Sequence, residues 1–216
     1  METDLRPRAV IFDLDGTLID SRLDLYHAVN HALRTVGLPE RSLEEVTGFV
    51  GEGVALLVSR ALGGHDDLMK PALSAWWSFY GEHLLDNTVL YPGIAELLDS
   101  ARVPLAVHTN KPGEPARRIL EGLGIRDRFV AVVGGDEAPR KPDPAGTRGI
   151  LAQMGVAAAD ALYVGDSLID IALARAVPMP VAAVTWGLVD PSRLAAADPG
   201  RLVSHPRELE PLVTGR

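Results

Sequence analysis

The chain has 216 residues, of which 47% are hydrophobic and 23% charged, a composition typical of a globular protein and not of a disordered or fibrous one. Its formal net charge is -8 and it has no basic cluster, which argues against nucleic acid as a partner because phosphate backbones are bound by grouped Lys and Arg side chains. The absence of cysteine excludes disulfides, thiol nucleophiles and thiolate metal sites. Any metal must therefore bind oxygen or imidazole, and oxygen ligands favour ions such as Mg²⁺.

The hydropathy of the chain gives two further expectations. No apolar stretch approaches the roughly 18 residues that a membrane span needs, and residues 1–8 lack the apolar segment of a signal peptide. We therefore expect no membrane partner and a cytoplasmic location. The length allows one core together with a small second unit.

The first predicted element is a strand that leads directly into acidic residues. The apolar run from Ala9 to Phe12 is typical of a buried strand, and Asp13-Leu14-Asp15-Gly16 follows it. Side chains alternate along a strand, so Asp13 and Asp15 would point the same way if the strand continued that far. Taken alone, the segment could also be a simple turn, because Asp and Gly both favour turns.

Residues 20–90 have the periodicity of helices and no strand-like run. Ser42 and Glu45 form a capping-box pattern at the start of one helix. Trp76 and Trp77 lie in the last helix, where we expect them to serve packing and not to form a platform for substrate. The predicted helices cover residues 23–33, a segment that begins at Ser42, and residues 54–62 and 66–85. We expect an inserted helical unit.

Glycines 48, 51 and 53 interrupt the second of these helices. They do not indicate a dinucleotide site, because such a site requires the glycines to follow a strand and here they follow a helical pattern.

From residue 91 onward, helices and strands alternate regularly. This pattern predicts a parallel sheet with helices on both faces and right-handed connections. The predicted strands are residues 103–108, 129–133, 161–164 and 181–184, with residues 201–203 as an edge strand, and the helices are residues 94–101, 114–123, 143–154 and 167–176.

Polar residues gather after the strands of this predicted sheet. Thr109 and Asn110 follow one strand, Lys141 lies in the loop after the next, and Asp166 and Asp170 follow the fourth. Each has an ordinary explanation alone, as a turn or capping residue or a solvated charge. Ligands in such folds bind outside the carboxyl ends of the strands, so these residues should meet Asp13 and Asp15 at one edge.

Four carboxylates at one edge would repel one another unless cations compensate them. Together with an ammonium, a hydroxyl and an amide, they suit phosphoryl transfer, which requires positioning and neutralisation of negative charge. Asp13 could attack phosphorus and form an acyl phosphate, with Mg²⁺ and Lys141 as the cations. Asp15 could protonate the leaving oxygen and then activate water.

These motifs resemble those of the haloacid dehalogenase superfamily of phosphohydrolases. The matching segments are DLDGTLIDS at residues 13–21, TNK at 109–111, KPDP at 141–144 and GDSLID at 165–170. The segment Gly51-Glu52-Gly53, together with HTNKP and VVGGDEAPRKPDP, is most similar to phosphoglycolate phosphatases. One departure is Val177-Pro178 after Ala176, where the superfamily often has glycine, and it concerns local packing only.

The resemblance implies an α/β fold, with a Rossmann-like parallel sheet core formed by residues 1–20 and 91–216 and a small α-helical cap formed by residues 21–90. The cap would close over the substrate and exclude water.

The resemblance also implies roles for individual residues. Asp13 would be the nucleophile and a magnesium ligand, and Asp15 the acid/base and a ligand through its backbone carbonyl. Lys141 would neutralise the phosphoryl group and the nucleophile. The remaining implied site residues are Asp166 as a metal ligand, Asp170 in support of the metal site, Thr109 and Asn110 as phosphoryl-binding groups, and Gly51 and Gly53 in the loop that approaches the substrate.

Three functions stay open at this point. The first is a Mg²⁺-dependent phosphatase for a small phosphorylated metabolite, with 2-phosphoglycolate as the leading candidate. The second is a sugar phosphomutase, which uses the same aspartyl phosphate, and the third is a receiver-like phosphoacceptor without turnover. The helical insertion and the acid two residues after Asp13 argue against the receiver. A monomer or a homodimer is expected.

Overall fold

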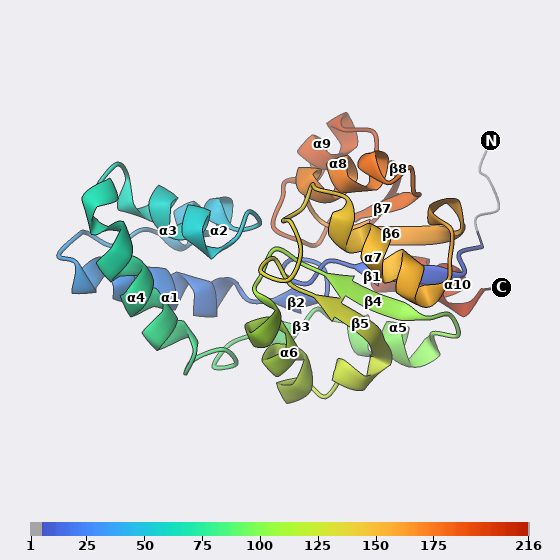
Figure 1. The fold of residues 1–216 in the computed structure, drawn as a ribbon, viewed down its shortest axis with the longest axis horizontal. Coiled ribbons are helices and arrows are strands. Elements are labelled where there is room, and N and C mark those ends of the chain that lie inside the picture. Colours follow the sequence, from blue (N-terminus) through green and yellow to red (C-terminus); the bar gives the residue numbers. More distant parts are fainter. Residues whose placement is uncertain (1–5, 216) are drawn as a thin grey trace.

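The computed structural model describes residues 6–215. Residues 1–5 and 216 of the predicted core lie outside the described residues. The segment 1–8, in which we expect no signal peptide, is therefore only partly described. A six-stranded parallel sheet with helices on both faces forms the larger part of the molecule (Figure 1). Its strands, in spatial order, are β5 (Phe129–Val133), β4 (Leu105–His108), β1 (Ala9–Phe12), β6 (Ala161–Gly165), β7 (Val181–Val184) and β8 (Gly200–Val203). The Rossmann-like α/β fold is confirmed.

The central strand β1 shows why helices cover both faces of the sheet. All four of its residues are buried, because successive side chains point to opposite faces and both faces are covered. Val10 and Phe12 belong to one hydrophobic cluster, and Ala9 and Ile11 to another. The first cluster includes residues of α5 (Ile94–Ser100), α6 (Gly113–Gly122) and α10 (Glu210–Thr214), and the second includes residues of α7 (Ala145–Met154) and α8 (Leu168–Ala176).

The helices between β1 and α5 form a separate, narrower part of the molecule, at the left of Figure 1. Ser42 does form the predicted capping box with Glu45. The last long helix ends at Tyr80 and not at residue 85, because Gly81 follows it and the chain then turns. The helices are α1 (Arg22–Thr35), α2 (Leu43–Phe49), α3 (Val54–Leu62) and α4 (Met69–Tyr80).

The chain enters and leaves this helical part through a short antiparallel ladder that the sequence pattern did not reveal. Strand β2 (Ile19–Asp20) pairs with β3 (Val89–Leu90). Two residues per strand are too few to show an alternating pattern, which explains why no strand was expected here. The ladder lies close to the predicted boundaries at residues 20 and 90, and the division into core and cap stays a prediction.

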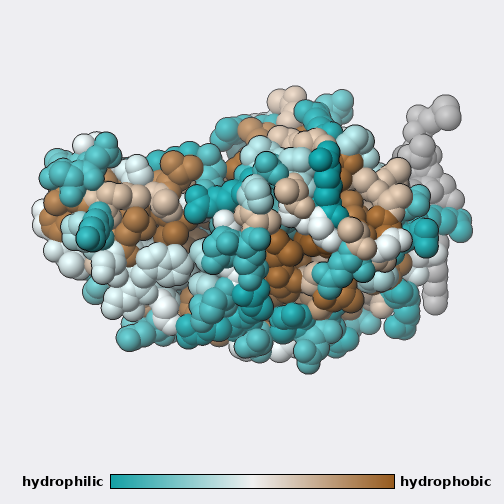
Figure 2. Space-filling model, in the orientation of Figure 1, coloured by the Kyte–Doolittle hydropathy of each residue, from teal (hydrophilic) through white to brown (hydrophobic). Residues whose placement is uncertain are grey.

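The remaining elements are short and lie mostly near the C-terminus. Helix α9 (Pro191–Ala196) packs Leu194 against Ile171 and Ala183. The 3₁₀ turns are η1 (Asp66–Leu68), η2 (Arg126–Arg128), η3 (Ala158–Asp160) and η4 (Pro206–Leu209). Within residues 6–215 no helix is both long and apolar enough to cross a membrane. The face drawn in Figure 2 carries polar and apolar residues in a mixed pattern.

Candidate active site

Three buried carboxylates meet at the carboxyl end of the sheet. Asp13 directly follows β1, Asp166 directly follows β6, and Asp170 lies in the first turn of α8. One carboxylate oxygen from each lies within 4.8 Å of the other two. Parallel strands bring residues that are far apart in sequence to one edge, so the predicted convergence of Asp13 with Asp166 and Asp170 is confirmed.

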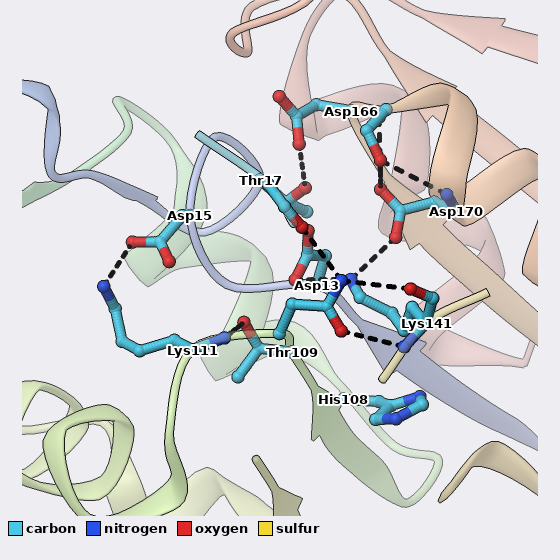
Figure 3. A network of polar contacts seen from close by, with 12 residues as sticks. Asp13, Asp15, Thr17, His108, Thr109, Lys111, Lys141, Asp166 and Asp170 are labelled. Carbon is cyan, nitrogen blue, oxygen red and sulfur yellow. Dashed lines mark hydrogen bonds and ion pairs between the residues drawn. The ribbon is translucent and has the colours of Figure 1, made fainter. Parts of the chain in front are cut away.

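Lys141 places its ammonium between two of these carboxylates (Figure 3). Its Nζ lies 2.8 Å from Asp13 Oδ1 and 2.8 Å from Asp170 Oδ1. Asn110 holds the loop in place, because its Oδ1 accepts from the Lys141 backbone N–H at 2.8 Å and its Nδ2 donates to the Lys141 carbonyl at 3.2 Å. The Lys141 side chain is 2% exposed. Lys141 is thus a structural counter-ion to the acids and not a solvated surface charge.

Burial raises the pKa of two acids of the site, Asp13 and Asp166. Burial raises the pKa of Asp13 to about 7, with Lys141 opposing the shift and Asp170 adding to it. Burial, followed by Asp13 and Asp170, raises the pKa of Asp166 well above its usual range. Burial lowers the pKa of Lys141, but Asp13 and Asp170 outweigh this and raise it overall. One ammonium therefore does not compensate three carboxylates.

The carboxylates fit a divalent metal ion. Apart from its ion pair with Lys141, Asp13 Oδ1 is buried without a hydrogen-bond partner among the described residues. Hard oxygen donors of this kind are the ligands that Mg²⁺ prefers. Gly16 also allows the close packing of the site, since a Cβ there would lie 2.2 Å from Asp166 Oδ2. A cation at this position would supply the missing positive charge.

Asp15 points away from the three carboxylates, as Figure 3 shows. Strand β1 ends at Phe12, so the strand geometry that would have aligned Asp13 with Asp15 does not extend to them. Ser21 Oγ donates to Asp15 Oδ1 at 2.5 Å, and Lys111 Nζ lies 3.0 Å from the same oxygen. The two acids therefore have separate surroundings, and of their two side chains only that of Asp13 belongs to the carboxylate group that fits a metal.

A cavity lies between the sheet edge and the helical part of the molecule. The predicted residues Asp13, Asp15, Thr109, Asn110, Gly51 and Gly53 line it. The Asn110 amide donates to the Gly51 carbonyl at 2.9 Å, which joins the sheet edge to the loop between α2 and α3. Gly51 and Gly53 both have positive φ, at 117° and 91°. The Asn110 side chain serves this connection, and its contact with a phosphoryl group stays a prediction.

The two sides of the cavity differ in chemistry. The helical side supplies four aliphatic side chains and two aromatic ones, which are Leu25, Val50, Val54, Leu57, Trp76 and Tyr80. The other side supplies most of the polar groups, together with Pro112, Leu188 and Val189. These polar groups are Asp13, Asp15, Asp166, Ser167, Thr109, Asn110 and Lys111. The polar side can carry chemistry, and the apolar side can exclude water and limit the size of a ligand.

Lys111, Tyr80 and Trp76 line the cavity, although the sequence assigned a binding role to none of them. Lys111 is part of the TNK motif, but a lysine in a loop gave no reason to expect burial. The Tyr80 hydroxyl, in α4, accepts a hydrogen bond from Lys111 Nζ at 2.9 Å, although the two residues are 31 positions apart in the sequence. Trp76 was expected to serve packing; it is 2% exposed, and it also lines the cavity. Lys111 could have been suspected from its neighbours Thr109 and Asn110, whereas Tyr80 had no signal in the sequence.

Comparison with known proteins supports the assignment that the motifs suggested. Residues 10–184 match the family model described as haloacid dehalogenase-like hydrolase. The phosphoglycolate phosphatase of Rhodospirillum rubrum is 45% identical over 194 residues, which cover 84% of this chain and 80% of that protein. The phosphoglycolate phosphatase of Chromobacterium violaceum is 39% identical over 199 residues, covering 88% and 90%.

Solved structures show the same fold. A predicted phosphoglycolate phosphatase from Haemophilus somnus has a TM-score of 0.89 and 31% identity, and the match covers 96% of this chain and 98% of that one. A haloacid dehalogenase-like family protein from Streptococcus pneumoniae has a TM-score of 0.86 and 28% identity, with coverage of 94% and 97%. The motifs, the fold and the extent of these matches together establish that the chain belongs to the haloacid dehalogenase-like hydrolase family.

Proposed function

We propose that this protein is a Mg²⁺-dependent phosphatase that hydrolyses a small phosphorylated metabolite, with 2-phosphoglycolate as the leading candidate. The observation that carries the proposal is the convergence of Asp13, Asp166 and Asp170 at the sheet edge, where Lys141 pairs with Asp13 and Asp170. Asp13 and Asp166 also line the cavity. Phosphoryl transfer needs such a concentration of opposite charges, because negative charge spreads over the phosphoryl oxygens in the transition state. The relatives named phosphoglycolate phosphatase supply the substrate candidate.

Asp13 is the proposed nucleophile. One of its oxygens forms a bond to phosphorus while the bond from phosphorus to the leaving oxygen breaks, which gives an aspartyl phosphate and an alcohol. Asp15 gives its proton to that leaving oxygen. Its side chain points away from the carboxylates around Asp13, so the two acids can face different atoms of the substrate.

Hydrolysis of the aspartyl phosphate reverses these proton movements. Asp15 takes a proton from water, the water oxygen bonds to phosphorus, and the bond to Asp13 breaks, which releases inorganic phosphate. Thr109 and Asn110 line the cavity at the place where the phosphoryl group would lie, and Lys141 would offset its charge.

A metal ion would bind the acidic group at the sheet edge. Asp13 and Asp166 would hold it, with Asp15 contributing its backbone carbonyl and Asp170 fixing Lys141 and Ser167 nearby. When bound, Mg²⁺ would neutralise the phosphoryl oxygens and the nucleophile.

The helical part, α1 to α4, would act as the cap. It covers the cavity with apolar residues, and Gly51 and Gly53 let the loop between α2 and α3 lie close to the sheet edge. Such a cover excludes water and selects among leaving groups. A cytoplasmic location and a monomeric or homodimeric state stay predictions.

A panel of small phosphoesters tests the proposal. We expect phosphate release from 2-phosphoglycolate in the presence of Mg²⁺, and its loss when a chelator removes the metal and return when Mg²⁺ is restored. The values of kcat/KM across the panel identify the preferred substrate. Failure to release phosphate from any member with Mg²⁺ present would contradict the proposal, and an isomerised sugar phosphate in place of free phosphate would indicate a mutase.

A further inference from the structure

Lys111 is a buried cation in the cavity that the mechanism above does not use. Its side chain is 5% exposed, and its Nζ lies 3.0 Å from Asp15 Oδ1 and 2.9 Å from the Tyr80 hydroxyl. These two contacts occupy two of the three N–H bonds of an ammonium group. Among the described residues that line the cavity, Lys111 is the one with a cationic side chain. It can therefore donate one more hydrogen bond to a ligand.

Two side chains of α4 that carry polar groups, Tyr80 and Trp76, line the cavity together with Lys111. The Tyr80 hydroxyl accepts from Lys111, which leaves its own proton available to a ligand. Trp76 lies one helical turn before Tyr80, and the centroids of the Trp76 and Tyr80 rings are 4.5 Å apart. Its indole N–H is buried and has no partner within the described part of the chain. A buried N–H without a partner costs free energy, which a bound acceptor would recover.

The rest of the helical wall is unsuited to a charged or strongly polar leaving group. Leu25, Val50, Val54 and Leu57 offer no hydrogen bonds. An anionic group bound there must therefore reach Lys111, because a carboxylate without a cationic partner is costly in an apolar cavity.

We propose that Lys111, with the indole N–H of Trp76 and the hydroxyl of Tyr80, binds the carboxylate of a short phosphorylated hydroxy acid. The proposal rests on the phosphatase function proposed above and narrows its substrate class. Asp15 must reach the leaving oxygen, and Lys111 is 3.0 Å from Asp15. A carboxylate separated from that oxygen by one carbon, as in 2-phosphoglycolate, therefore falls within reach of the Lys111 ammonium.

A pair of substrates of equal length tests this proposal. We expect the protein to prefer 2-phosphoglycolate over its neutral amide, 2-phosphoglycolamide, in kcat/KM. Lys111→Met should lower kcat/KM for 2-phosphoglycolate by about 100-fold or more, because it leaves the carboxylate without its cation. The loss of kcat/KM for the amide should be at least about tenfold smaller, so that the variant no longer prefers 2-phosphoglycolate over the amide as strongly as the wild type does.

The two adjacent tryptophans give a matched control. Trp76→Phe removes the buried N–H and should reduce the preference for the carboxylate about five- to tenfold. Trp77 packs edge-on against Trp76 but does not line the cavity among the described residues, so Trp77→Phe should leave the preference unchanged. This pair also decides the matter if Lys111→Met does not fold.

Each contrary result has a separate meaning. Equal losses for both substrates in Lys111→Met would show that Lys111 only positions Asp15, which overturns the proposal. A wild-type protein that hydrolyses both substrates equally well would also overturn it, while the phosphatase function stands. Equal effects of Trp76→Phe and Trp77→Phe on the preference would exclude the indole N–H and so overturn the proposed carboxylate site. Absence of phosphate release from every ester would refute the phosphatase function itself.

Discussion

Two buried aspartates, eleven positions apart in the sequence, lie in contrasting surroundings. Asp13 at the sheet edge shares its space with Asp166 and Asp170, and its Oδ1 has the Lys141 ammonium as its partner. Asp24 in α1 is even less exposed, at 1% against 7%. It accepts hydrogen bonds from the backbone and side chain of both Asn87 and Thr88, at 2.7–3.1 Å.

The contrast shows that burial alone does not make a carboxylate reactive. Neutral donors surround Asp24 and satisfy both of its oxygens, so it fastens α1 to the segment that returns to the sheet. Asp13 is surrounded by other carboxylates, and its oxygens keep lone pairs that can coordinate a metal ion or attack a phosphorus atom. The first arrangement stabilises the fold, and the second keeps a charged group available for chemistry.

The largest effect is expected from Asp13→Asn. The amide is a poor nucleophile, so kcat for phosphate release should fall by about 10⁴-fold or more. The fold should persist, because the change removes a charge from a group of carboxylates that repel one another. Steady-state kinetics and circular dichroism measure the two effects. A variant that keeps substantial activity would remove Asp13 as the nucleophile.

Asp24→Asn is expected to lower stability while leaving catalysis nearly unchanged, the reverse of Asp13→Asn. The amide nitrogen would face N–H and O–H donors, so the free energy of unfolding should fall by about 2–3 kcal/mol. At temperatures where the variant is folded, kcat should stay within about threefold of the wild type. Denaturant unfolding measures the first and phosphate release the second.

Asp67→Asn is the control for this change. Asp67 also lies in the helical part, but it is exposed, and the same substitution there should change the free energy of unfolding by less than about 0.5 kcal/mol. If Asp24→Asn behaved like this control, the contrast between the two buried aspartates would be wrong.

Most of the sheet could be predicted from the sequence because its strands are buried on both faces. Such strands are short apolar runs between helical patterns, and β5 and β7 begin and end where the sequence placed them. The ladder of β2 and β3 could not be predicted, because its pairing depends on where the helical part closes back onto the sheet. The end of α4 at Tyr80 was also missed, since the apolar pattern continues through Leu84 and Leu85.

The acidic part of the site was predictable for the same topological reason. Asp13 and Asp166 each follow a parallel strand, and parallel strands end at one edge. The contact between Lys111 and Tyr80 was not predictable, because it depends on how α4 is oriented over the sheet. Neither residue lies in a periodic pattern that indicates the other.

The smallest expected effect concerns a third buried group, His108. It tests whether positive charge next to the carboxylates is confined to the lysine side chains. It is the last residue of β4, directly before Thr109, and its Nδ1 lies 2.9 Å from Thr147 Oγ1. Burial lowers the pKa of His108 to about 3, and the nearby Lys141 adds to this effect against the opposing influence of Asp170. His108 should therefore be neutral, next to a site full of charges.

The low pKa of His108 makes stability depend on pH with a definite sign. Below its ordinary pKa of 6.5, the unfolded chain binds a proton at His108 that the folded protein does not bind until pH falls to about 3. Stability from this residue is thus complete above about pH 6.5 and decreases by about 1.4 kcal/mol for each pH unit below it. His108→Gln should lower stability at neutral pH, yet lose less of it between about pH 6.5 and 5.5 than the wild type does. Denaturant unfolding of both proteins at these two pH values measures the difference. Equal losses would mean that His108 gains its proton in the folded state, so that positive charge extends beneath the sheet edge and is not confined to Lys141 and Lys111.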